Sequence, residues 1–83
     1  MKIRIKARVA QKEEKIIHID TEYIRLDAAL KLADAVQSGG HAKIVIQDGE
    51  VKVNSEICLS RGKKIRPGDS IEFDRKIYKI ENN

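Results

Sequence analysis

Apolar and basic residues alternate strictly from Ile3 to Val9, which is the pattern of a strand with one buried face. The polar run at positions 11–14 predicts a turn, and Lys15 to Ile19 is expected to return as a second strand. The pattern therefore predicts an N-terminal β-hairpin over residues 1–19. Such a hairpin needs the rest of the chain to cover its apolar face.

After Arg25 the spacing of the apolar residues changes to that of a helix. A period of three and four, typical of a helix with one buried face, links Leu26, Ala29, Leu30, Ala33 and Val36. Asp27 is a suitable N-cap because its carboxylate can accept free backbone N–H groups. The pattern predicts a helix from about residue 28 to residue 37.

The Ser-Gly-Gly sequence at 38–40 interrupts this helix and predicts the start of a second one. Ser38 is a good N-cap for a helix over residues 39–48, and Gly49 stands where a left-handed cap would end it. The buried stripe of this helix would be Ala42, Val45 and Ile46. Because almost no linker separates the two helices, we expect them to pack as a compact helix-turn-helix unit.

Short apolar runs and turn residues fill the rest of the chain. Residues 51–53 and 57–59 predict two strands that a turn at positions 54 and 55 connects. The Pro-Gly pair at 67–68 suits a type II turn, with further strands following it over 70–73 and 77–80. Together these elements predict a single α+β domain over residues 1–83, in which two packed helices lie against a small, mainly antiparallel sheet.

The chain is small and basic, with 17 Lys and Arg residues against 13 Asp and Glu residues and a net charge of +4. A chain of 83 residues has room for one thin core, which favours a binding surface over a catalytic cleft. The positive balance favours a polyanionic partner, although solubility alone also explains such a balance.

Several classes of function have no signal in the sequence. Cys58 is the only cysteine, so we expect a core residue there and neither a disulfide nor a cysteine zinc site. His18 and His41 fall on different elements, and no nucleotide or nucleophile motif accompanies them. The expectation is a cytoplasmic protein that is not an enzyme and has no cofactor, metal, small-molecule substrate or membrane partner.

Two segments could bind an anion. The first is the start of the second helix, where free N–H groups and the helix dipole attract phosphate beside Ser38, Gly39, Gly40, His41 and Lys43. The alternative for this segment is a tight turn that needs glycine for steric reasons. The second is the cationic run from Arg61 to Arg66, which is alternatively a solvated hairpin tip. The basic face of the first strand is more typical of edge protection.

A set of residues in the middle of the chain resembles a known RNA-binding module. The residues that carry the resemblance are Arg25-Leu26-Asp27, Leu30, Ser38, Ala42, Ile46, Gly49, Val51, Val53-Asn54 and Gly68-Asp69-Ser70-Ile71. This pattern resembles the RNA-binding domain named after the fourth small-subunit ribosomal protein, also called the alpha-L motif, with its core over residues 25–73 here. Segments 30–34, 37–43 and 61–64 are most similar to short stand-alone bacterial members of the YaaA and YbcJ kind.

The resemblance implies a fold and a function. It implies two helices on a small sheet, with structured RNA, either ribosomal or transfer RNA, bound across the helices and the adjoining hairpin and with no catalysis. The resemblance also implies an arginine, in many members of the broad superfamily, where this chain has Gly39, so one phosphate contact is expected to be lost, although the double glycine matches the stand-alone subgroup. Ser55 replaces the usual glycine after Asn54, which changes the geometry of the hairpin.

With the resemblance added, we expect both anion-binding segments to share one surface. The expected RNA-binding residues are Lys31, Ser38, Gly39, Gly40, His41, Lys43, Lys52, Arg61, Lys63, Lys64 and Arg66. Their contacts would be mainly to phosphate and sugar of folded or double-stranded RNA, with the ribosome among the expected partners, because the sequence offers no aromatic platform for stacking single-stranded bases.

Two other functions are compatible with parts of the pattern. A β-grasp sulfur carrier shares a hairpin, a helix and the 68–71 segment, but it needs a C-terminal glycine pair, whereas this chain ends Glu81-Asn82-Asn83. A protein-interaction adaptor of a ribosomal or replication complex could use the same fold and patch to meet an acidic protein.

Overall fold

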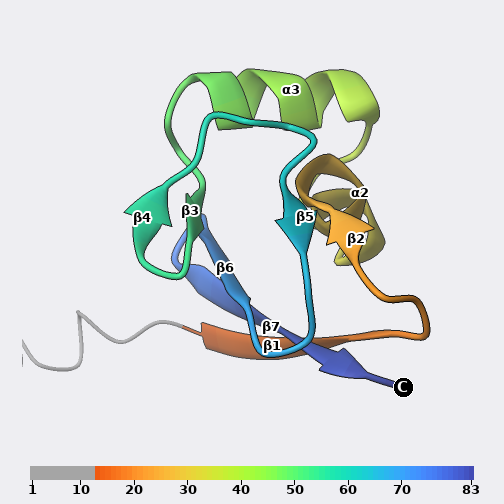
Figure 1. The fold of residues 1–83 in the computed structure, drawn as a ribbon. Coiled ribbons are helices and arrows are strands. Elements are labelled where there is room, and N and C mark those ends of the chain that lie inside the picture. The colour runs from red at the N-terminus through yellow and green to blue at the C-terminus, as the bar shows by residue number, and fades with distance from the viewer. Residues whose placement is uncertain (1–12) are drawn as a thin grey trace, which may run out of the picture.

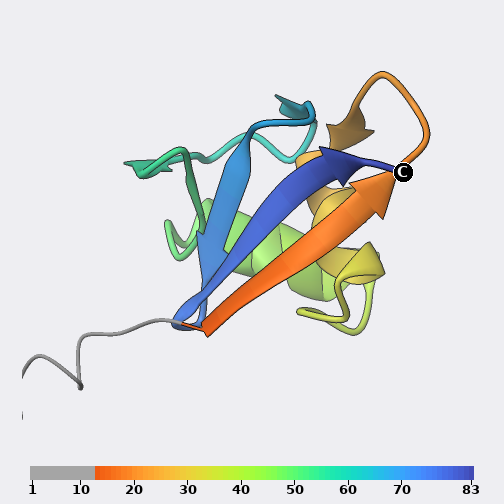
Figure 2. The same ribbon diagram turned by 90° about the horizontal axis from the view of Figure 1, so that it is seen from below.

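Two short helices lie on one face of a twisted sheet in the computed structural model, which describes residues 13–83 (Figure 1). The elements in chain order are β1 Glu13–Ile19, β2 Ile24–Arg25, α2 Leu26–Leu32, α3 Gly39–Gln47, β3 Lys52–Val53, β4 Glu56–Ile57, β5 Lys64–Ile65, β6 Ser70–Phe73 and β7 Lys76–Asn82. Figure 2 shows β6, β7 and β1 side by side, with both helices behind them. The predicted α+β class, with its two helices packed against a mainly antiparallel sheet, is confirmed.

The main sheet has the strand order β1-β7-β6-β3-β4. Its pairs are antiparallel except for β1 and β7, which run parallel from Glu13 opposite Lys76 to Ile19 opposite Asn82. The strand predicted at 15–19 is confirmed as β1, but it begins two residues earlier, so Glu13 and Glu14 are not in the predicted turn. The predicted partner strand of the N-terminal hairpin, Ile3 to Val9, lies outside the described residues.

Apolar residues from the inner face of the sheet and from both helices form the core. The buried residues on the strands are Ile17, Ile19, Val53, Ile65, Ile71, Phe73, Tyr78 and Ile80. From the helices come Leu26, Ala29 and Leu30 on α2 and Ala42, Val45 and Ile46 on α3. The predicted buried stripes are confirmed except that Ala33 is half-buried, and Val36 is buried from the connection between the helices.

Helix α2 starts earlier than the sequence predicts, and its N-cap is not Asp27. The helix begins at Leu26 with Arg25 at the N-cap, and no side chain caps it. Instead the Leu26 N–H donates to the Lys63 carbonyl at 2.9 Å and the Asp27 N–H donates to the Arg61 carbonyl at 3.2 Å. The prediction failed because a loop distant in the sequence supplies the acceptors that a capping side chain usually provides.

The end of α2 is also earlier than predicted. Helix α2 stops at Leu32, whereas the apolar spacing extended it to residue 37. Asp34 adopts a left-handed φ of 62°, and the Ala35 N–H bonds back to the Leu30 carbonyl at 2.9 Å. These are the features of a Schellman cap with aspartate in the place usually held by glycine. The helices are therefore connected by residues 33–38 and not joined directly.

Helix α3 follows its local signals closely. Ser38 is the N-cap, and its Oγ accepts the backbone N–H of His41 at 3.1 Å. The helix ends at Gln47, and Gly49 has a φ of 78°, as expected of a left-handed cap. The predictions for this helix are confirmed to within one residue.

The turns predicted at positions 54–55 and 67–68 are confirmed, but two short strands that pair with each other were not predicted. Asn54 and Ser55 both have positive φ, at 51° and 74°, which is the conformation of a type I′ turn. Gly68 has a φ of 100°, and the Asp69 N–H donates to the Arg66 carbonyl at 2.9 Å, as in a type II turn. The unpredicted pair is β2 with β5, and each of these strands has two residues, which is too short to show a period.

No helix within residues 13–83 is long and apolar enough to cross a membrane.

Candidate functional site

Four basic side chains extend from the loop before β5, from β5 and from the residue after it, on a firmly held backbone. These residues, here named the basic cluster, are Arg61, Lys63, Lys64 and Arg66. The carbonyls of Arg61 and Lys63 accept the first N–H groups of α2, and Lys64 pairs with Arg25 in the β2–β5 ladder. Because its carbonyls cap the helix, this loop is fixed at one surface of the protein.

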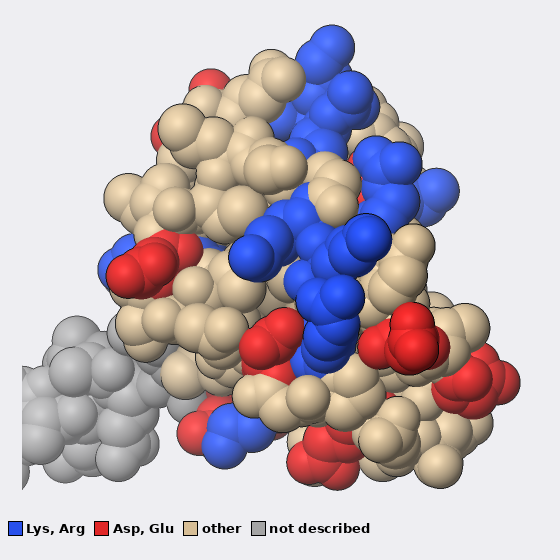
Figure 3. Space-filling model, viewed as in Figure 1, with Lys and Arg blue, Asp and Glu red and all other residues tan. Residues whose placement is uncertain are grey.

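The basic cluster is exposed and its charges are not neutralised by ion pairs. All four residues are exposed, and none of them takes part in an ion pair among residues 13–83. Figure 3 shows Lys and Arg side chains gathered into one band, which runs from above α3 downward over the region of β5. Unpaired cations in a row attract a polyanion strongly because binding releases its condensed counterions.

Tyr23 is a member of this surface that the sequence analysis missed. The Lys64 Nζ lies 5.0 Å from the centroid of the Tyr23 ring, and the Arg66 Cζ lies 5.9 Å from it. The ring therefore holds two cations of the cluster by cation–π attraction. The sequence offered no signal for this contact because Tyr23 and Lys64 are far apart in the chain and meet only through the β2–β5 pair.

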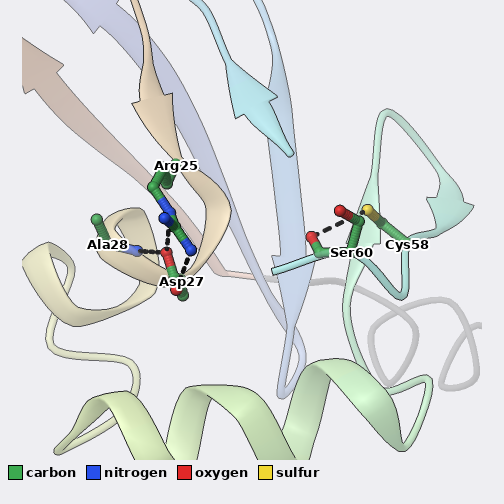
Figure 4. A network of polar contacts seen from close by, with 5 residues as sticks. All are labelled: Arg25, Asp27, Ala28, Cys58 and Ser60. Atoms are coloured by element: carbon green, nitrogen blue, oxygen red, sulfur yellow. Dashed lines mark hydrogen bonds and ion pairs between the residues drawn. The ribbon is translucent and has the colours of Figure 1, made fainter. Parts of the chain in front are cut away.

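Arg25 borders the cluster, but a carboxylate already engages it. Its Nε and Nη2 donate to the two carboxylate oxygens of Asp27 at 3.2 and 3.1 Å (Figure 4). Asp27 Oδ1 also accepts the Ala28 N–H at 2.8 Å, which fixes the carboxylate at the start of α2. Arg25 therefore adds less free charge to the surface than the residues of the cluster.

Asp69 connects the end of the cluster to the β3–β4 hairpin. Its carboxylate accepts the Arg66 N–H at 2.8 Å and Asn54 Nδ2 at 3.1 Å. The hydrogen bond from the Arg66 backbone is the main cause that lowers the pKa of Asp69, and the Asn54 bond and the charges of Lys63 and Arg66 act in the same direction. Asp69 thus remains ionised beside the cations and fixes the backbone of Arg66.

At the start of α3, the Ser38 and His41 side chains are already engaged and the two glycines are not crowded. The side chain of Ser38 is engaged by the His41 N–H, and His41 Nδ1 accepts the Gln37 N–H at 3.4 Å. Neither Gly39 nor Gly40 has a positive φ, and a Cβ at Gly39 would meet nothing within 4 Å. The steric explanation for the glycines is therefore wrong, and the space above the helix start is open to a ligand or a side chain.

The other predicted cations lie on separate elements. Lys31 is exposed in the last turn of α2, and Lys43 is exposed on α3, the helix over which the basic band begins (Figures 1 and 3). Lys52 is opposite Ile57 and Glu72 in the main sheet, next to the inward-facing Val53. Because side chains alternate along a strand, Lys52 faces away from the core and from the helices. The contacts of the described residues do not bring Lys31 or Lys52 to the basic cluster.

The charges of this surface favour contact with an anion. Within residues 13–83, no group of three or more His, Cys, Asp or Glu residues is arranged to hold a metal ion. The fixed cations favour electrostatic contact with phosphate oxygens, and the ionised Asp69 contributes only by holding the Arg66 backbone in place.

Comparison with known proteins shows the relationships of the chain. The family described as the S4 domain matches residues 17–81. A protein from Bacillus subtilis (strain 168) called "Probable ribosome maturation protein RlbA" is 50% identical over 58 residues, which cover 70% of this chain and 82% of that relative. The matched region includes both helices, the β3–β4 hairpin and the basic cluster.

Proposed function

This chain belongs to the S4 domain family, and from that premise we propose that it is a non-catalytic protein that binds structured or double-stranded RNA through the phosphate backbone. The observation that carries the proposal is the basic cluster, whose four exposed cations lack ion-pair partners among residues 13–83. Such cations are available to phosphates, and their fixed backbone lowers the entropy lost on binding.

The binding surface would extend from the cluster toward α3. In this proposal Lys63, Lys64 and Arg66 contact one stretch of phosphates, and the open N–H groups at the start of α3, with Lys43, contact another. Duplex RNA suits this arrangement because its wide, shallow groove presents phosphates and 2′-hydroxyls to a flat surface. Tyr23 is covered by Lys64 and Arg66, which favours backbone contact over base stacking.

The name of the B. subtilis relative supports a ribosome-associated role. That relative is called a probable ribosome maturation protein, and by analogy we propose that ribosomal RNA is the ligand of this chain. A protein with this role would act in the cytoplasm.

The proposal is tested by measuring RNA affinity against salt concentration. The probe is a synthetic RNA hairpin with a fully paired stem, and the variant is Lys63→Gln combined with Lys64→Gln. We expect the logarithm of the affinity of the wild-type protein to fall linearly with the logarithm of the salt concentration. The double variant should lose roughly 1.4 to 1.8 units of that slope, because each of two phosphate contacts contributes roughly 0.7 to 0.9 units.

A matched control separates local contacts from overall charge. Lys15→Gln combined with Lys79→Gln removes the same charge from residues that pair with Glu13 and Glu14 on β1. This control should keep the wild-type slope. An unchanged slope in the Lys63/Lys64 variant would contradict the proposal, and cellular associations that need these lysines but survive nuclease treatment would favour an acidic protein partner.

A further inference from the structure

A hollow of about 360 Å³ lies between the β3–β4 hairpin and the residue before β5. Its lining combines apolar side chains with one amide, one anion and one cation: Val53, Ile57, Cys58, Leu59, Asn54, Glu56 and Lys63. Because Lys63 belongs to both, the hollow is directly beside the basic cluster.

The apolar wall of the hollow is unusually open to water. Ile57 and Leu59 are each 60% exposed, and the half-buried Cys58 lies between them in the chain. The Cys58 thiol donates to the Ser60 carbonyl at 3.7 Å (Figure 4), so its polar hydrogen is directed to the backbone. Large apolar side chains gathered around a concave surface are typical of a ligand site.

The two charged residues give the hollow one positive group, on Lys63, and one negative group, on Glu56. Lys63 is held at the edge of the hollow because its carbonyl accepts the Leu26 N–H at 2.9 Å and its N–H donates to the Ser60 carbonyl at 3.3 Å. Glu56 is exposed in β4 across from it. A matching ligand has a phosphate, a flat apolar body and an edge that donates hydrogen bonds.

We propose that this hollow receives the base of an unpaired nucleotide in the RNA that the basic cluster binds. Its phosphate would lie at Lys63, the face of its base against Ile57 and Leu59, and an N–H of its base edge at the Glu56 carboxylate. Paired bases stay stacked inside a duplex, whereas an unpaired base can leave the stack and enter a pocket. This inference rests on the proposed function and deepens it, since it specifies a bulged or looped RNA.

The test compares two RNA hairpins that differ in one feature. One has a fully paired stem, and the other has the same stem with one unpaired nucleotide. We expect the wild-type protein to bind the bulged hairpin about tenfold more tightly, the effect of moving a small apolar area out of water. Ile57→Ala combined with Leu59→Ala should bind both hairpins with the affinity that the wild-type protein has for the paired one.

Two further variants test whether the preference for the bulge depends on the hollow and whether Glu56 contacts the base. Ile44→Ala is the matched control, since Ile44 is 59% exposed on α3 and does not line the hollow, and it should keep the preference for the bulge. Glu56→Gln should change the order of preference when the unpaired base is varied, because a carboxylate only accepts hydrogen bonds whereas an amide both accepts and donates them. Circular dichroism confirms that each variant is folded.

The outcomes separate this inference from the proposed function. If the wild-type protein binds both hairpins equally, or the Ile57/Leu59 variant keeps the preference, the base site is wrong and the phosphate-binding proposal stands. If the wild-type protein binds neither hairpin, both proposals fail.

Discussion

The Asp69 carboxylate and the Asn54 side-chain amide are joined by a hydrogen bond of 3.1 Å, which ties the β3–β4 turn to the β5–β6 turn. Asn54 completes the contact by accepting the Ser70 N–H at its Oδ1 at 3.0 Å. Since Asp69 also holds the Arg66 N–H at 2.8 Å, this pair positions the hairpin relative to the end of the basic cluster.

We predict that Asp69→Asn destabilises the protein at neutral pH by about 1 kcal/mol. The pKa of Asp69 is lowered in the folded protein from its ordinary value of 3.8. The ionised carboxylate therefore stabilises the fold above that value, and this contribution is lost as the pH falls through the lower folded pKa. The difference in unfolding free energy should shrink between about pH 5 and pH 2 in urea titrations. Asp20→Asn, at an exposed position, is the control, and a constant difference for Asp69→Asn across this range would refute the linkage.

Ser55→Gly should stabilise the protein. Ser55 has a φ of 74°, a conformation that an L-residue with a side chain adopts at a cost and glycine adopts freely. The expected gain is about 0.5 kcal/mol after the greater flexibility of glycine in the unfolded chain is subtracted. Thermal and urea unfolding measure it. Ser60→Gly is the matched control, because φ at Ser60 is not positive. Glycine there should be neutral or destabilising. Equal effects of the two substitutions on the unfolding free energy would exclude relief of strain at Ser55.

Gly39→Arg should strengthen RNA binding. The space around a Cβ at Gly39 is empty to 4 Å, so a side chain can start there without displacing the chain. The added guanidinium would supply one further phosphate contact, raising the salt slope by about one unit and the affinity about tenfold. Gly39→Gln is the control for the gain in helix propensity, since it removes the same glycine without adding charge. An affinity gain that is equal in both variants would exclude a phosphate contact by the added guanidinium.

Tyr23→Leu should weaken RNA binding about threefold without changing its salt slope. The ring orders Lys64 and Arg66 from centroid distances of 5.0 and 5.9 Å, and its loss leaves both charges present but less well placed. Tyr23→Phe keeps the ring and should bind as the wild-type protein does. Binding measured at several salt concentrations distinguishes the cases, and a reduced slope in Tyr23→Leu would show that the ring does more than order the cations.

Short-range signals in the sequence predicted the elements that local chemistry controls. Ser38 and Gly49 correctly bracket α3, because a capping side chain and a left-handed glycine act within one helical turn. The turns at Asn54-Ser55 and Pro67-Gly68 are confirmed for the same reason. The cationic run from Arg61 to Arg66 was visible as composition, and the resemblance gave it a function to test.

Long-range contacts decided the features that the sequence analysis missed. Helix α2 starts at Leu26 and not after Asp27, because carbonyls of Arg61 and Lys63 cap it from a distant loop. The parallel β1–β7 pair and the contact of Tyr23 with Lys64 likewise join residues from far apart in the chain.

The sequence by itself determined which residues are basic, which are apolar, and where the turns and the second helix occur. Only the tertiary structure decided which cations remain free of carboxylates, that Tyr23 lies among them, and that Ile57 and Leu59 border a hollow beside Lys63. The physical reason is that charge, caps and turn conformations belong to local residues, whereas a binding surface forms from residues that the packing of the core brings together.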